Sequence, residues 1–170
     1  MASFFFSPAP HSLVSSWKEF EVSSHAKNIF EVKQFIPVSA SLSIQNNLGS
    51  HFSQRRYIYT FPFKTYNVDY ILLDINDPHS VACHFPSIRA FYFTTQLSSQ
   101  EYYSKIVDVF QNENYGVEYF SNDGYLLFKR GTGREKNKGA FEMFNRNAKK
   151  VFSRYEMFEI EYIDNFFDES

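Results

Sequence analysis

IPVSASLSIQNNLGSHFSQRRYIYTFP (residues 36–62) and VDYILLD (residues 68–74) are the stretches that decide the fold of this chain. Residues 40–45 alternate small or polar side chains with apolar ones, which is the two-residue period of a half-buried strand. A turn with one helical turn is predicted to follow and to lead into a β-rich run that stops at Pro62. The second stretch is nearly all apolar, as expected for a strand covered on both faces.

Two helices are predicted to flank these strands. The first covers residues 24–35 and ends before Pro37, because the residue before a proline avoids the helical region. The second begins at a capping-box pattern formed by Ser98 and Glu101, and we expect Gly116 to end it. Apolar stripes at helical spacing mark the expected buried faces: Ala26, Ile29, Phe30 and the stem of Lys33 in the first helix, and Tyr103, Ile106, Val107 and Phe110 in the second.

The last part of the predicted domain is a β-hairpin. Residues 117–120 and 125–129 are strand-like and flank Ser-Asn-Asp-Gly. The Asp-Gly pair favours a tight hairpin turn because it tolerates positive φ. Residues 76–97 show no clean period and are expected to form a long loop.

These elements predict an α/β fold: one domain with a mixed, mostly parallel sheet of about five strands, flanking helices and a C-terminal β-hairpin. The domain is expected to cover residues 15–131, after an irregular lead-in at 1–14 and before a charged and aromatic helical extension at 132–170. We expect the strands at 40–45 and 57–61 to be parallel, with a short right-handed crossover between them.

Charge and composition restrict the classes of partner. The net charge of −2 argues against nucleic acid as a partner of the whole chain. Cys83 is the single cysteine, so an internal disulfide is impossible. No run approaches the roughly 20 apolar residues of a transmembrane helix, so none is expected in this chain.

The charge is uneven near the C-terminus. Residues 129–154 hold nine Lys or Arg and two acidic residues, whereas residues 155–170 hold six acidic residues and no basic one. A basic amphipathic helix is predicted at 140–155, and it could lie on an anionic membrane surface. The alternative, which we prefer, is packing on the domain or contact with the acidic segment that follows.

The order of several sequence blocks resembles one family. Ile-Pro, Ala-Ser-Leu-Ser, Asn-Asn-Leu, His-Phe-Ser-x-Arg-Arg, Phe-Pro, Asp-Tyr-Ile-Leu-Leu-Asp and Asp-Gly-Tyr-Leu-Leu-Phe-Lys-Arg-Gly follow one another over roughly residues 7–131. They resemble the C-terminal soluble domain of a family of uncharacterised polytopic membrane proteins of unknown function that look related to GT-C glycosyltransferases. The family motif is similar to Ala-x-Asn-x-Leu-x-Pro-His-Leu-x-x-Arg. Here the Asn46-Asn47 pair, His51 and Arg55 match it, while Ile44 and Ser50 replace Ala and Pro.

The resemblance implies a module without its own catalytic acids, because a GT-C enzyme would carry them in membrane-proximal loops. We therefore expect this chain to be a detached fragment or an independently encoded module that is not catalytic alone. A membrane-embedded parent or partner subunit is the implied partner. The implied location is the extracytoplasmic face of the membrane, and the cytoplasm is the alternative if the resemblance fails.

Polar residues on the turn after the first strand form the main candidate site. Arg55 could bind a phosphate or carboxylate through two parallel hydrogen bonds, and His51 could orient that group. Asn47 and Asp74 complete the candidate ligand-binding set. In the alternative reading, Asn46 and Asn47 cap the turn, His51 is structural, and Arg55 pairs with an acid such as Asp74.

Metal and cofactor sites receive less support. Asp74 and Asp77 could hold a divalent cation through their carboxylates, but the Asn-Asp and Asp-Pro pairs in this segment are also ordinary turn formers. His79, Cys83 and His84 lack the four ligands of a structural zinc site. No phosphate-binding loop or dinucleotide glycine motif is present, so no cofactor is predicted.

The sequence therefore predicts a non-catalytic module that helps to bind or position a substrate or a partner. One alternative is a small metal-dependent glycan- or nucleotide-processing enzyme. Another is an intracellular interaction protein that acts through its aromatic tail.

Overall fold

A computed structural model describes residues 23–76 and 99–152 of the chain. The predictions for the lead-in at 1–14, for Asp77, His79, Cys83 and His84, and for the acidic segment at 155–170 lie outside these residues. The described elements, in chain order, are α2 (Ser24–Gln34), β1 (Leu42–Ile44), the 3₁₀ helix η2 (Asn46–Phe52), β2 (Ile58–Thr60), β3 (Tyr70–Asp74), α3 (Ser99–Gln111), β4 (Tyr115–Phe120), β5 (Tyr125–Arg130) and α4 (Asn137–Phe152).

The five strands form one sheet in the order β2-β1-β3-β5-β4. β1 is parallel to both β2 and β3, which confirms the parallel pairing predicted for the first two strands. β5 is antiparallel to β3 and to β4. The α/β class and the mixed sheet are confirmed, but the expectation of a mostly parallel sheet is wrong. The predicted hairpin supplies one antiparallel pair, β4 with β5, and the difference comes from its strand β5, which also lies antiparallel beside β3, so that two strand pairs are parallel and two antiparallel.

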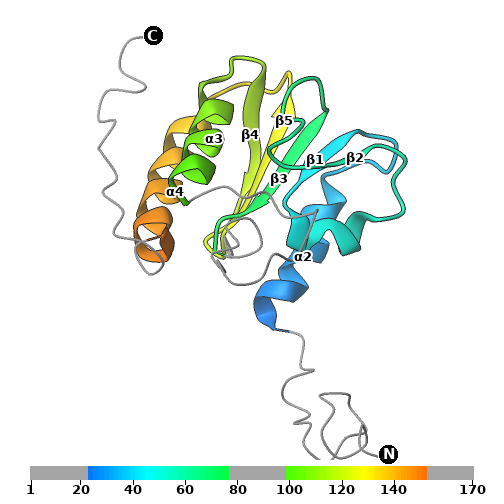
Figure 1. The fold of residues 1–170 in the computed structure, drawn as a ribbon, viewed down its shortest axis with the longest axis horizontal. Helices are drawn as coiled ribbons and strands as arrows, with labels where there is room; N and C mark the ends of the chain where they lie inside the picture. Colours follow the sequence, from blue (N-terminus) through cyan, green and yellow to red (C-terminus); the bar gives the residue numbers. More distant parts are fainter. Residues whose placement is uncertain (1–22, 77–98, 153–170) are drawn as a thin grey trace, which may run out of the picture.

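Helices cover both faces of the sheet. Figure 1 shows α3 and α4 side by side against one end of the sheet, away from α2. Alternate strand residues face opposite sides, so β3 contributes Ile71 and Leu73 to the core under α3 and α4. Tyr70 and Leu72 of the same strand belong to the second core, which α2 closes. The strands therefore connect two separate hydrophobic cores.

Helix α2 forms where the sequence predicts it. The Ser23 hydroxyl accepts a hydrogen bond from the Ala26 amide at 3.0 Å and caps its first turn. Ile29 and Val32 are buried, whereas Phe30, which was expected in the core, is 59% exposed. A three-residue spacing keeps Ile29 and Val32 on one side of the helix, and the position after Ile29 is rotated away from it.

Strand β1 is buried along its whole length, so the prediction of a half-buried strand is wrong. Leu42 and Ile44 face the core under α2, and Ser43 is buried on the other face. Ser43 is the register partner of Ile71, which lies in the core under α3 and α4. Both sides are covered because β1 lies between two parallel strands and has a helical layer on each face.

Gly116 does not end α3, contrary to the sequence expectation. The helix ends at Gln111, and Gly116 lies in β4. A Cβ atom at this position would lie 2.2 Å from the Gly133 carbonyl oxygen and 2.5 Å from that of Thr132. Glycine is needed here because another backbone segment approaches the strand closely.

Helix α4 packs on α3 and the sheet. Its apolar face contributes Ala140, Phe141, Phe144 and Ala148 to the core. At its first residue, the Asn137 side-chain oxygen accepts a hydrogen bond from the Val117 amide at 2.9 Å. For the described part of the basic helix, packing on the domain is therefore the observed arrangement. None of the helices in residues 23–76 and 99–152 has the length and apolar character needed to cross a membrane.

Candidate functional site

An open depression lies between the end of α2 and the 3₁₀ helix η2. Strand β1 ends at Ile44, and η2 follows after a single residue, so the segment that leaves the sheet turns back toward α2. Leu48 and Phe52 of η2 are buried and anchor it to the core. The depression has a volume of about 300 Å³ and is lined by Lys33, Val38, Ser50, His51, Phe52, Ser53, Gln54 and Arg55.

Arg55 is fixed at the inner side of this depression. It is only 8% exposed, and its Nη2 donates a 2.6 Å hydrogen bond to the Ile36 carbonyl. Its Nη1 donates to the Pro37 carbonyl, and its guanidinium carbon lies 5.3 Å from the centre of the Phe52 ring. Burial lowers the pKa of Arg55 from its usual value. The alternative in which Arg55 pairs with Asp74 is wrong, because its partners are backbone carbonyls after α2.

Lys33 and His51 bring further basic groups to the depression. The Lys33 Nζ lies 5.8 Å from the centre of the same Phe52 ring. The exposed His51 ring makes an edge contact with Phe30 at 6.5 Å. Within residues 23–76 and 99–152, no carboxylate forms an ion pair with Lys33, His51 or Arg55. The lining is therefore basic and contains no acidic side chain.

Asp74 belongs to a different group, which we name the His25 clamp and define as His25, Asp74, Asp123 and Tyr125. Asp74 is the last residue of β3 and is 2% exposed. The His25 Nε2 lies 2.7 Å from Asp74 Oδ2, and the Nδ1 lies 2.7 Å from Asp123 Oδ2. The imidazole stacks on Tyr125, with 4.5 Å between ring centres and 5° between planes. The clamp ties the first turn of α2 to the end of β3 and to the hairpin turn.

The clamp favours a protonated imidazole. Burial is the largest single effect on the pKa of His25 and lowers it, but the hydrogen bonds and charges of Asp74 and Asp123 together outweigh burial and raise it. Each ring nitrogen then donates to a carboxylate, and only the imidazolium has two such donors. The pKa of Tyr125 is also raised, first by burial and then by the charges of the same two carboxylates.

The backbone near Asp74 is held by the residue that follows β1. The Gln45 side-chain oxygen accepts from the Asp74 amide at 3.1 Å and from the Tyr102 hydroxyl of α3. The Asp74 carboxylate itself accepts from the Asn76 amide at 3.1 Å, the side-chain-to-backbone bond of a turn former. These bonds indicate a structural role for Asp74.

The structure thus separates the four sequence candidates. His51 and Arg55 line one depression, Asp74 belongs to the His25 clamp, and Asn47 lies half-buried on η2 outside the lining of the depression. The metal hypothesis pairs Asp74 with Asp77, which is outside the described residues. Within the described residues, no group of three or more His, Cys, Asp or Glu side chains is arranged to hold a metal ion.

Lys33 and His25 were not predicted as site residues. Lys33 was expected only to bury its stem, yet it is exposed and lines the depression. His25 lies 49 residues before Asp74, so no local pattern relates the two. For Lys33, the only local sequence signal is its place in the last turn of α2, before Pro37. This signal is not specific to a binding site, because cations are common at helix C-termini, where they interact favourably with the helix dipole.

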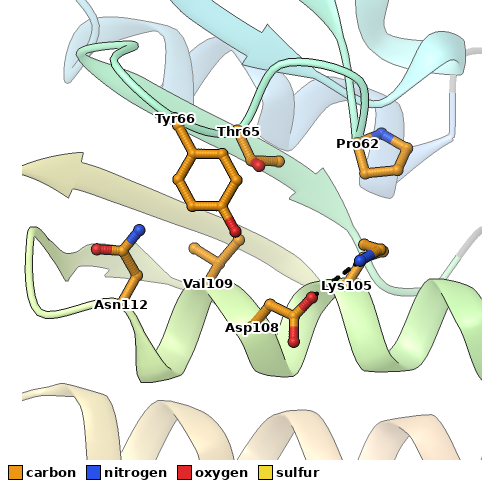
Figure 2. Close-up of a pocket in the computed structure, with 7 residues that line it drawn as sticks. All are labelled: Pro62, Thr65, Tyr66, Lys105, Asp108, Val109 and Asn112. Carbon is orange, nitrogen blue, oxygen red and sulfur yellow. Dashed lines mark hydrogen bonds and ion pairs between the residues drawn. The ribbon is translucent and has the colours of Figure 1, made fainter.

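A second, smaller depression lies between the loop after β2 and α3. Its volume is about 100 Å³, and Figure 2 shows the Tyr66 ring pointing from the loop toward α3. On the helix, Lys105 and Asp108 form an exposed ion pair at 3.1 Å. Because its single cation is already paired with an acid, this depression is a weaker candidate for binding a charged group than the depression at η2.

The depression at η2 offers fixed hydrogen-bond donors, and the His25 clamp offers a closed set of charges. The first arrangement can bind an acceptor group, while the second holds elements together. No family model matches the sequence, and comparison with curated proteins and with solved structures gives no significant match.

Proposed function

We propose that this chain is a non-catalytic module that binds or positions a ligand or partner through the depression at η2. This is the role implied by the resemblance to the C-terminal domain of GT-C-like polytopic membrane proteins. The observation that carries the proposal is that Lys33, His51 and Arg55 line a single depression without an acidic counterpart.

The chemistry of the His25 clamp supports a role without catalysis. A general base needs a free lone pair within reach of the substrate proton. Both nitrogens of His25 lie at hydrogen-bond distance from carboxylates, and Asp74 is buried. The titratable groups of the His25 clamp are therefore hydrogen-bonded to one another, which leaves no lone pair of His25 free to act as a base.

The form of the depression supports binding. Ligand pockets have volumes of roughly 300–1,000 Å³ and combine apolar surface with a few placed polar groups. The depression is at the lower end of this range and combines Val38 and Phe52 with hydroxyl, amide and basic side chains. Arg55 is already ordered by the two carbonyls, so binding would lose little additional side-chain entropy there.

The proposal can be tested by an NMR titration of the whole chain with a panel of neutral sugars, free amino acids, small organic acids and phosphate esters. We expect at least one class to shift the amide signals of residues 33–38 and 50–55, and His51→Gln to reduce the shift. Lys64→Gln is the control, because Lys64 is exposed and lies over the Tyr59 ring outside the depression. Shifts confined to other regions, or none with any class, would contradict the proposal.

A further inference from the structure

We infer that the depression at η2 recognises a phosphate monoester group. This inference rests on the proposed function and adds the chemical class of the ligand. It is carried by three basic side chains that approach the same hollow from different segments: Lys33 from α2, His51 from η2 and Arg55 from the loop after η2.

Two positive charges flank the same aromatic ring and have no carboxylate partner among the described residues. The Lys33 ammonium and the Arg55 guanidinium lie over one ring, that of Phe52, at 5.8 and 5.3 Å from its centre. Opposite charges attract each other more strongly beside a buried group than in water. Within the described residues no carboxylate pairs with either cation, so an anion that enters the depression would gain from both charges.

Arg55 is positioned as a fixed donor for such an anion. A guanidinium carries five N–H groups, and the Ile36 and Pro37 carbonyls engage one on each terminal nitrogen. These bonds and the Phe52 ring hold the plane of the guanidinium, while its remaining N–H groups have no hydrogen-bond partner among the described residues. A preorganised donor of this kind gives a shorter and stronger bond to a charged acceptor than a neutral donor does.

The number of donors favours a phosphoryl group over a carboxylate. A phosphate monoester carries about −1.5 to −2 charges at neutral pH and three strong acceptor oxygens. Three basic groups from three segments can each meet one of these oxygens, whereas a carboxylate has two oxygens and one charge. The exposed Ser50 hydroxyl provides a further donor at the rim.

Apolar surface beside the basic groups provides space for the organic part of the ester. Val38 is 73% exposed and lines the depression, and Phe30 contacts the His51 ring from α2. A small phosphorylated molecule and a phosphorylated lipid headgroup both present this chemistry. The experiment below separates these two sources.

The test is a calorimetric titration of the whole chain with phenyl phosphate and, separately, with benzoate, which replaces the phosphate by a carboxylate on the same ring. We expect phenyl phosphate to bind more tightly. Lys33→Gln should weaken its binding roughly tenfold, as expected for the loss of one charge-assisted hydrogen bond. The control is Lys27→Gln, which changes an exposed lysine on the same helix outside the depression and should leave affinity within about twofold.

A second arm measures cosedimentation with phosphatidylcholine vesicles that contain or lack phosphatidic acid. Binding to phosphatidic acid alone, with the same dependence on Lys33, would support a lipid headgroup as the source. Because Lys33 and His51 are exposed, their glutamine variants should keep the wild-type unfolding midpoint, which separates lost binding from lost folding.

Three results would overturn the inference: benzoate binding as tightly as phenyl phosphate, binding that is unchanged in Lys33→Gln, or no binding in either arm. The proposed function is tested separately from the phosphate assignment. If a sugar, an amino acid or a carboxylic acid perturbs residues 33–38 and 50–55 while phosphate esters do not, the depression is a binding site and only the phosphate assignment fails.

Discussion

His25 shows how much of this structure depends on single residues that meet over long sequence distances. Its ring joins Asp74 at the end of β3 and Asp123 in the hairpin turn, each at 2.7 Å. The residue has its partners only in the folded state. Its protonation is therefore linked to folding, and the sign of the link follows from the direction of the pKa shift.

The pH dependence of stability tests this link. The pKa of His25 is raised above 6.5, so its contribution is complete below that pH and is lost as pH rises through the folded-state value. We expect the free energy of unfolding of the wild type to fall over that window more than that of His25→Gln. Urea unfolding measured at a series of pH values gives the comparison. Parallel profiles for wild type and His25→Gln would show that the protonation of His25 is not linked to folding.

The contribution of Arg55 to stability can be measured against that of its neighbour Arg56. Arg55→Gln leaves the carbonyls of Ile36 and Pro37 without their donor, so we expect a loss of about 2–4 kcal/mol in the free energy of unfolding. Arg56 is exposed, and its guanidinium lies 5.3 Å from the Tyr57 ring. Arg56→Gln should change stability by no more than about 0.5 kcal/mol. Equal losses in chemical denaturation would show that the bonds of Arg55 are not stabilising.

At the scale of elements, local signals predicted most of the fold. The hairpin is the clearest case, since Asp-Gly tolerates positive φ and Gly124 in its turn has φ of 105°. The parallel pairing of the first two strands was predicted from their short crossover, and α2 and the apolar stripe of α3 from helical periodicity. The errors concern neighbours that local sequence does not contain: the layers on both sides of Ser43, the backbone beside Gly116 and the carbonyls that hold Arg55.

The candidate site was predicted only in part for the same reason. The turn after β1 concentrates polar residues, so His51 and Arg55 could be chosen from sequence. Lys33 reaches the depression because α2 packs across the sheet, and His25 meets its partners because β3 ends beside the hairpin turn, at the same end of the strands. Tertiary packing creates both arrangements.

Replacing either of two glycines by alanine tests the packing of elements, and the two changes in stability should have opposite signs. Gly116→Ala would place a Cβ within 2.5 Å of two backbone oxygens, so we expect a loss of about 3 kcal/mol or more. At Gly139 of α4, an added Cβ meets nothing within 4 Å. Gly139→Ala should therefore gain about 0.5–1 kcal/mol through better helix propensity. Thermal and urea unfolding of both variants check the two signs, and a neutral Gly116→Ala would mean that the 132–133 backbone shifts easily.

At the scale of the whole molecule, the two cores share their strands. β3 and β5 each supply residues to the core under α2 and to the core under α3 and α4. If β3 and β5 separate, the buried residues of both cores become exposed to solvent together. We therefore expect the described part of the chain to unfold as one cooperative unit that includes α4.

Phe144 of α4 tests this cooperativity. It is fully buried and stacks on Tyr103 of α3 at 5.1 Å. Phe144→Ala should cost about 3–5 kcal/mol and lower the unfolding midpoint equally in far-UV and near-UV circular dichroism. Glu142→Ala changes an exposed position on the same helix and should cost less than about 0.5 kcal/mol. Separate far-UV and near-UV midpoints would show that α4 and the sheet unfold independently.

The strand order also sets how the backbone opens to solvent. β3 lies at the centre with a paired strand on each side, whereas β2 and β4 each have one neighbour and form the margins of the sheet. Central amides can exchange with deuterium only when neighbouring strands separate, whereas the three-residue β2 can detach alone. The amides of the outer strands β2 and β4 should therefore exchange first, and those of the central strand β3 last.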